Sequence, residues 1–207
     1  MSSEQKLKEG DKITETVESS NAEELLFFTS AHQVYKSRVA DFSDTKASVL
    51  GDFAASALQF DEGENAIYMV NTKDYSGFML FVFDNGRIAK VPLSSYVTKT
   101  NRKKLIKAYC DKYTLHTALY FKENCDILLK STSKRMLIVN TASIPEKAAK
   151  DNGGIAVMTQ KKGHRVYDVR VYKSGSLESE HRYKTKNLPA AGSLKPVGEV
   201  KQQKLDI

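Results

Sequence analysis

The sequence has few cysteines and no long apolar run, and both absences exclude classes of protein. Only Cys110 and Cys125 occur in 207 residues, without CxxC spacing or a nearby pair of histidines. They therefore predict reduced packing residues of a cytosolic protein, not a disulfide framework or a zinc site. No run of eighteen apolar residues is present, and Met1 is followed by SSEQKLKEGDK instead of an apolar signal segment. We expect a cytoplasmic protein that is neither secreted nor membrane-spanning.

Catalytic motifs are also missing from the sequence. It has no glycine-rich phosphate loop that ends in Lys-Ser or Lys-Thr, and no Ser or Cys nucleophile in a recognisable motif. Four histidines, His32, His116, His164 and His181, are scattered without the spacing of metal ligands. We expect no catalytic site, no metal and no cofactor in this chain.

Positive charge is abundant, and it is concentrated in one part of the chain. Residues 1–72 contain six Lys and Arg against thirteen Asp and Glu, whereas residues 73–207 contain 26 against 12. The densest stretch is KTNRKKLIKAY at residues 99–109. Such a positive field attracts polyanions over a Debye length of roughly 8–10 Å. Nucleic acid is a candidate partner; an acidic protein surface, or simple solvation of the lysines, is the alternative.

The chain repeats with a period of about fifty residues. One unit is an apolar strand, a polar turn and a second strand, in LLFFTSAHQVYK, MLFVFDNGRIAK and ILLKSTSKRMLI (residues 25–36, 79–90 and 127–138). A second half-unit recurs at residues 8–17, 61–70, 111–120 and 161–170. Connectors rich in Ser, Thr, Lys, Asn and Gly separate them and lead into a further strand.

This pattern predicts an all-β array of blades, in which each unit buries its sheet by stacking on its neighbours. We expect residues 47–57 to be the local exception to the absence of helix. The segments are a remnant of a preceding blade, three four-stranded blades and an extended or partly disordered tail, at residues 1–18, 19–72, 73–122, 123–173 and 174–207. The half-unit at residues 8–17 lacks a hairpin before it, which suggests a fragment of a longer protein.

The repeats resemble a known family, the C-terminal DNA-binding domain of the A subunit of bacterial type IIA topoisomerases. The resemblance rests on LLFFTSAHQVYK, FDNGRIAKVPLSSYVTKTNRKKLIKAY, NTASIPEKAAKDNGGIAVMTQKKGHRV and the late NLPAAGSL. It implies a β-pinwheel, a propeller-like disc whose blades exchange an outer strand, with DNA bent around a basic rim. It also implies that this chain is the non-catalytic part of a bacterial, nucleoid-associated enzyme. Strand cleavage would lie in an earlier domain of the A subunit, and ATP would be handled by a B subunit.

Two departures from the family narrow the expectation. The family disc usually has more blades than the three visible here. Gyrase also carries a heptapeptide close to QRRGGKG, and the nearest stretch here, KDNGGIA at residues 150–156, has the glycines without the arginines. Topoisomerase IV therefore fits the sequence better than gyrase.

The candidate DNA contacts are basic residues that recur unit by unit on turns and connectors. Wrapping DNA needs many dispersed phosphate contacts and little base readout. The candidates are Lys36, Arg38, Arg87, Lys90, Lys99, Arg102, Lys103, Lys104, Lys107, Lys134, Arg135, Lys147, Lys150, Lys161, Lys162, His164 and Arg165. The alternative function is a protein-interaction scaffold whose basic rim docks an acidic partner.

Aromatic residues divide into two groups. The phenylalanines in the apolar runs (Phe27, Phe28, Phe78, Phe81 and Phe83) are expected in the core, because base-stacking rings need exposure beside a basic groove. Tyr96, Tyr109 and Tyr113 flank the basic connector and are weaker candidates for contact with DNA.

Overall fold

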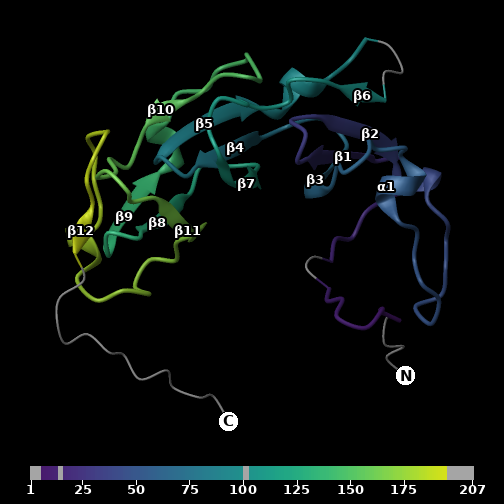
Figure 1. Ribbon diagram of the computed structural model, residues 1–207, viewed down its shortest axis with the longest axis horizontal. Coiled ribbons are helices and arrows are strands. Elements are labelled where there is room, and N and C mark those ends of the chain that lie inside the picture. The colour runs from purple at the N-terminus through teal and green to yellow at the C-terminus, as the bar shows by residue number, and fades with distance from the viewer. Residues whose placement is uncertain (1–5, 14–15, 100–102, 195–207) are drawn as a thin grey trace. The chain divides into compact units, whose positions relative to one another are not determined.

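The chain forms three four-stranded antiparallel sheets in the computed structural model, which describes residues 6–13, 16–99 and 103–194 (Figure 1). The helical segments are single turns of three or four residues: η1 Val39–Asp41, α1 Ala54–Ala57, η2 Leu93–Tyr96, η3 Thr141–Ser143 and η4 Glu180–Arg182. α1 lies within residues 47–57, as expected. The predicted all-β fold is confirmed.

The first sheet has the strand order β3-β1-β2-β6. Its strands are β1 Glu24–Thr29, β2 Val34–Arg38, β3 Ala66–Thr72 and β6 Lys104–Leu105. β1 is buried on both faces: Leu25 and Phe27 pack with Tyr35 in one cluster, and Phe28 packs edge to face on Tyr96. This two-sided burial explains why the run reads as continuous Leu and Phe instead of alternating with polar residues.

The second and third sheets repeat this arrangement. The second has the order β10-β5-β4-β7, with β4 Phe78–Phe83, β5 Arg87–Pro92, β7 Leu115–Phe121 and β10 Ile155–Ala156. The third has the order β11-β8-β9-β12, with β8 Asp126–Ser131, β9 Arg135–Asn140, β11 Val166–Val171 and β12 Ser193–Leu194. All six residues of β4 are buried. The five phenylalanines expected in the core are buried, so that prediction is confirmed.

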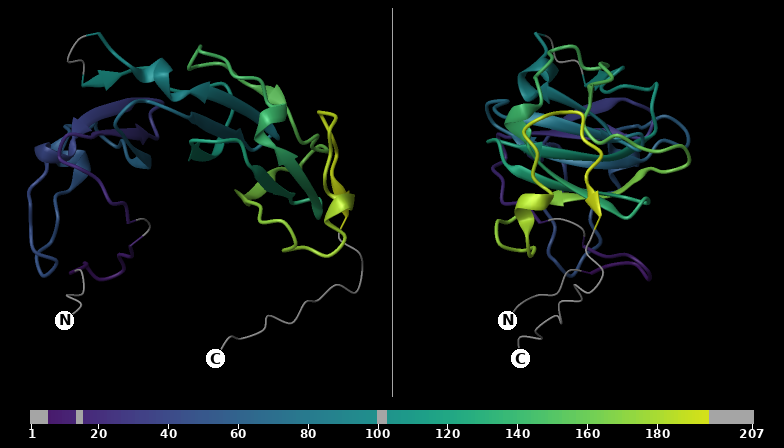
Figure 2. Two further views of the ribbon diagram at one scale, coloured as in Figure 1. Left: turned by 180° about the vertical axis from the view of Figure 1, so that it is seen from behind. Right: turned by 90° about the vertical axis from the view of Figure 1, so that its left-hand side faces the viewer.

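The fourth strand of each sheet comes from a later part of the chain. The connector after β5 supplies β6 to the first sheet, and the connector after β9 supplies β10 to the second. β12 completes the third sheet from the C-terminal segment, drawn in yellow in Figure 2. This is the strand exchange that the resemblance implies.

The C-terminal segment is more ordered than expected. Residues 174–194 were predicted to form an extended or partly disordered tail, but they contain η4 and β12, and Tyr183 is buried against β9 residues Met136 and Ile138. The prediction was wrong for these residues, because the third sheet needs a fourth strand and an apolar cover.

Glycine allows the exchanged strands to approach their sheets closely. Gly154 and Gly192 both have a left-handed backbone, with φ of 64° and 71°. A Cβ on Gly154 would overlap the carbonyl oxygen of Ile88, and one on Gly192 would lie 2.6 Å from that of Met136. NGG at 152–154 and PAAG at 189–192 therefore have the same function, since only glycine fits there.

The N-terminal segment does not form the expected strand. Residues 6–13 and 16–23 contain no strand, and the Lys6 backbone N–H donates to the Ala47 carbonyl at 2.7 Å. Both views of Figure 2 show this segment, in purple, with the blue loop that precedes α1. The expected strand is thus absent from these described residues, and the interpretation of residues 1–18 as the remnant of a preceding blade stays a prediction.

The chain divides into two compact units. The first contains residues 1–78, 92–111 and 148–151, and the second contains residues 79–91, 112–147 and 152–207. The first sheet lies in the first unit, and the third sheet lies in the second. Among the described residues no helix is long and apolar enough to cross a membrane. The blade boundaries given above remain a prediction.

Candidate nucleic-acid interface

Two buried tyrosines hold the ends of the basic connector, residues 92–109. The Tyr96 hydroxyl donates to the Ala108 carbonyl at 2.7 Å, and the Tyr109 hydroxyl donates to the Thr29 carbonyl at 2.7 Å. Burial raises the pKa of Tyr109 to about 12, so its hydroxyl keeps its proton at neutral pH. Neither ring is available to a base, and the candidate role of both residues in DNA contact was wrong. Tyr113 is half-buried and packs against Arg87 and Phe83.

The lysines of the connector divide into structural and exposed side chains. Lys104 lies in β6 and forms an ion pair with Asp61 at 2.6 Å. This contact lowers the pKa of Asp61 and raises the pKa of Lys104. Lys99, Lys103 and Lys107 are exposed. Arg102 lies outside the described residues.

Arg87 and Arg135 hold exchanged strands. They occupy the same position, the first residue of the second hairpin strand. The Arg87 guanidinium donates to the carbonyls of Gly153 and Gly154, at 2.9 and 2.6 Å, and Arg135 donates to the carbonyl of Gly192 at 2.7 Å. These charge-assisted bonds fix the exchanged segments on their sheets. The sequence signal was an arginine after each turn paired with a later glycine, and sequence reasoning missed it.

Lys90 is also structural. Its side chain is only 3% exposed, and its ammonium group contacts the Glu146 carboxylate at 3.2 Å and the Asn124 side-chain oxygen at 2.8 Å. Because its ammonium group is buried and already paired, Lys90 does not lie with the exposed candidate residues. Lys147 lies in the segment that covers it and is exposed, whereas Lys150 is half-buried.

The third sheet carries an exposed group of basic side chains, which we name the third-sheet basic turn. It consists of Lys134, Lys161, Lys162, His164 and Arg165. The Thr132 backbone N–H donates to the Arg165 carbonyl at 2.9 Å, which joins the β8–β9 turn to the loop before β11. Four of the five side chains are Lys or Arg, and all five are exposed, so they can reach phosphate groups.

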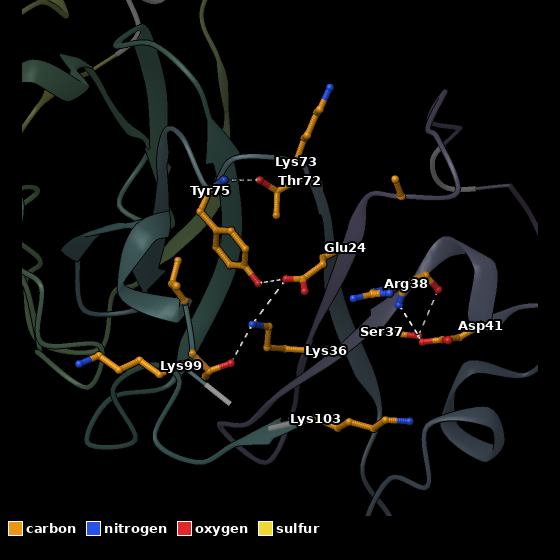
Figure 3. A pocket seen from close by; sticks show the side chains of 13 residues that line it. Glu24, Lys36, Ser37, Arg38, Asp41, Thr72, Lys73, Tyr75, Lys99 and Lys103 are labelled. Carbon is orange, nitrogen blue, oxygen red and sulfur yellow. Dashed lines mark hydrogen bonds and ion pairs between the residues drawn. The ribbon is translucent and has the colours of Figure 1, made fainter. Parts of the chain in front are cut away.

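The first unit contains a second basic feature, the basic pocket, with a volume of about 600 Å³ (Figure 3). It lies where β1 begins and β2 and β3 end, and its cations are Lys36, Arg38, Lys73, Lys99 and Lys103. The side chain of Lys36 is 10% exposed and pairs with Glu24 at 3.5 Å. Lys73 was not a sequence candidate, although a lysine also follows the corresponding strand β7 at Lys122.

The described residues contain no group of three or more His, Cys, Asp or Glu side chains that could hold a metal ion. The candidate interface consists instead of cations on loops.

These sheets, with their exchanged strands, define the fold of topoisomerase C-terminal domains. The chain superposes on the C-terminal domain of DNA topoisomerase IV with a TM-score of 0.64 and 20% identity, over 74% of this chain and 48% of that one. It superposes on the C-terminal domain of E. coli ParC with a TM-score of 0.61 and 15% identity, over 81% and 69%. The gyrase A C-terminal domain gives a TM-score of 0.51 at 14% identity, over 75% and 50%.

Similarity in sequence is limited. The chain is 27% identical over 96 residues to the DNA gyrase A protein of Haloquadratum walsbyi (strain DSM 16790 / HBSQ001), a match of 44% of this chain and 11% of that protein. No protein-family model matches the chain. The chain thus spans a small part of this curated relative and about half of the topoisomerase IV domain.

Proposed function

We propose that this chain binds duplex DNA without sequence preference, as the C-terminal domain of a type IIA topoisomerase A subunit. The observation that carries the proposal is the third-sheet basic turn on a fold shared with topoisomerase C-terminal domains. Lys and Arg on loops suit contact with phosphates and carry little sequence information. The domain bends or wraps a long duplex and presents it for strand passage, while catalysis belongs to the rest of the enzyme and its ATPase B subunit.

Binding of a labelled duplex, measured by fluorescence anisotropy over a range of salt, tests this proposal. The slope of log K against log salt is about −0.9 for each phosphate contact. The triple variant Lys161→Glu, Lys162→Glu, Arg165→Glu should bind far more weakly and with a shallower slope. The control with the same change in charge is Lys6→Glu, Lys8→Glu, Lys12→Glu, at three exposed positions of the N-terminal segment. Equal losses in the two variants would mean that only net charge matters.

An acidic polypeptide is the competing ligand in the same assay. Poly-glutamate that displaced the duplex at equal charge concentration would favour the protein-interaction scaffold. No binding of duplex at low salt would overturn the proposal.

We further propose topoisomerase IV as the parent enzyme. The support is the absence of a QRRGGKG-like heptapeptide from these 207 residues. The complete A subunit, together with its ATPase partner on relaxed plasmid, should decatenate and relax DNA. ATP-dependent accumulation of negative supercoils would identify gyrase instead.

A further inference from the structure

Lys36 and Lys90 occupy the same place in the repeat. Each lies in the second hairpin strand, four residues after a turn residue with a left-handed backbone, His32 (φ 57°) or Gly86 (φ 80°). The turn of the third sheet has Lys134 (φ 61°), and the position four residues later is Ile138.

The chain covers this position differently in the three sheets. Over Lys90 lies the segment that includes Glu146, whose carboxylate neutralises the buried ammonium group. Over Ile138 lies the segment of Tyr183 and Lys184, and the Tyr183 carbonyl accepts from the Ile138 N–H at 2.7 Å. An apolar side chain there needs no counter-charge, whereas a buried lysine does.

Lys36 receives no carboxylate from the connector that covers it. The Lys103 carbonyl accepts from the Lys36 backbone N–H at 2.7 Å, and the chain continues directly into β6. Residues 92–109 contain no Asp or Glu. Where the second sheet has Glu146, the first sheet has the open basic pocket.

Both carboxylates that line the basic pocket are already engaged. Glu24 accepts from the Tyr75 hydroxyl and pairs with Lys36. Asp41 accepts from the Arg38 backbone N–H at 2.9 Å and from the Ser37 hydroxyl at 3.0 Å. The lining groups therefore leave an excess of positive charge.

Four cations surround the mouth of the pocket: Arg38, Lys73, Lys99 and Lys103. Within the described part of the chain, none of their side chains forms an ion pair with a carboxylate. In Figure 3, Lys99 and Lys103 extend to opposite sides and Lys73 extends away from the Tyr75 ring. Long lysine side chains can turn toward an anion that enters between them.

We propose that the basic pocket binds a phosphate group in the place that corresponds to the Glu146 carboxylate of the second sheet. The Lys36 ammonium group and the Thr98 hydroxyl, which are 3.2 Å apart, both line this pocket. The four cations at the mouth of the pocket donate charge-assisted hydrogen bonds to the phosphate oxygens. A phosphodiester of bound duplex or a free phosphate ion can supply this group, and the first source rests on the function proposed above.

Amide chemical shifts in ¹H–¹⁵N NMR spectra test this site with inorganic phosphate alone, at constant ionic strength with chloride as the reference anion. The amides of Ser37, Tyr75 and Thr98 should shift and saturate. Lys73→Ala should weaken phosphate binding about threefold to tenfold, the range for one exposed charge-assisted contact.

Lys122→Ala is the matched control, because Lys122 follows β7 as Lys73 follows β3. It should leave the phosphate affinity unchanged. Phosphate shifts that do not saturate, or that respond equally to both variants, would overturn the proposal.

A duplex arm then identifies the source of the phosphate. If the same three amides shift with duplex, the pocket holds a backbone phosphate. If phosphate shifts them but bound duplex does not, the pocket is a site for free phosphate. If the chain binds duplex but shows no response to phosphate, the pocket proposal is refuted and the proposed function stands. If the chain binds phosphate but fails to bind duplex, the proposed function is refuted and the pocket proposal stands.

Discussion

Two turns at the same place in the repeat carry opposite charge. Residues 61–64 (DEGE) precede β3 and residues 161–164 (KKGH) precede β11. Both close with an N–H to carbonyl bond across three residues, Glu64 to Asp61 at 3.0 Å and His164 to Lys161 at 2.9 Å. Their backbones therefore agree, and only their side chains differ.

The acidic turn stabilises the fold. Glu64 is 6% exposed and accepts from the Thr29 hydroxyl, from the Tyr35 hydroxyl at 2.7 Å and from the Asp61 N–H at 2.9 Å. Residues 161–164 are exposed, and the ring of His164 makes a surface contact with the Thr132 hydroxyl at 3.2 Å. One backbone position can thus carry a buried side chain that stabilises the core in one sheet and an exposed side chain in another.

The largest expected effect is loss of stability on removal of Glu64. Glu64→Ala removes the acceptor of the Tyr35 hydroxyl and of the Asp61 N–H, and one of the two acceptors of the Thr29 hydroxyl, at a cost of about 3 kcal/mol in the free energy of unfolding. His164→Ala should change it by less than about 0.5 kcal/mol. Urea denaturation of both variants measures their free energies of unfolding. Equal losses of stability would show that the two turns do not differ in their contribution to the fold.

The second-largest expected effect is on DNA binding, when the charge of a single turn residue is reversed. Lys162→Glu should weaken duplex binding about tenfold at low salt and reduce the salt slope by about 0.9. Glu62→Lys, at the corresponding exposed position of the acidic turn, should alter it less than about twofold, because Asp61 remains beside it. A large gain in affinity with Glu62→Lys would show that the acidic turn also lies near DNA.

Alanine at the shared glycine should cost the same in both turns. Gly63 and Gly163 have φ of 75° and 80°, and a Cβ at either would meet no atom within 4 Å. Only the left-handed backbone is then penalised, by about 1–2 kcal/mol in each variant. Thermal unfolding measures the loss of stability in each variant. If the two losses differ by more than about 1–2 kcal/mol, the two backbones are not equivalent.

The smallest effect is a response of the acidic turn to low pH. The hydrogen bond from Lys104, then that from Gln33, lowers the pKa of Asp61. A lowered pKa in the folded state contributes stability above the unfolded pKa of about 3.9, and this stability is lost as pH falls through the folded pKa. An NMR titration should show Asp61 titrating below that value, and Lys104→Met should move it back upward. An unchanged titration in Lys104→Met would rule out Lys104 as the cause.

The repeat made much of the fold predictable. Apolar runs with turns such as DNG predicted the hairpins. The connectors were expected to be loops that lead into a further strand, whereas β6 and β10 lie within the connectors themselves. Partners distant in sequence decided the rest. The C-terminal segment was expected to be extended because it is rich in Lys, Gly, Pro and Ala, yet β12 pairs with β9 and Tyr183 is buried against β9.

The sequence predicted that the candidate interface consists of basic residues, but it could not predict which of these residues are exposed. Lys90 and Lys36 align in the repeat, but Glu146 covers one and the basic pocket lies beside the other. Arg87 and Arg135 matched the pattern of a DNA contact. In the structure their guanidinium groups donate to the carbonyls of Gly154 and Gly192 in the exchanged segments.

The sequence by itself determined the hairpins, their spacing and the location of positive charge, because these depend on local pattern and composition. The tertiary structure decided which cations are exposed, which are buried and where the basic pocket lies. The physical reason is that the environment of each charge is set by a segment some forty to seventy residues away, as for Lys104 with Asp61, Lys90 with Glu146 and Arg87 with Gly154.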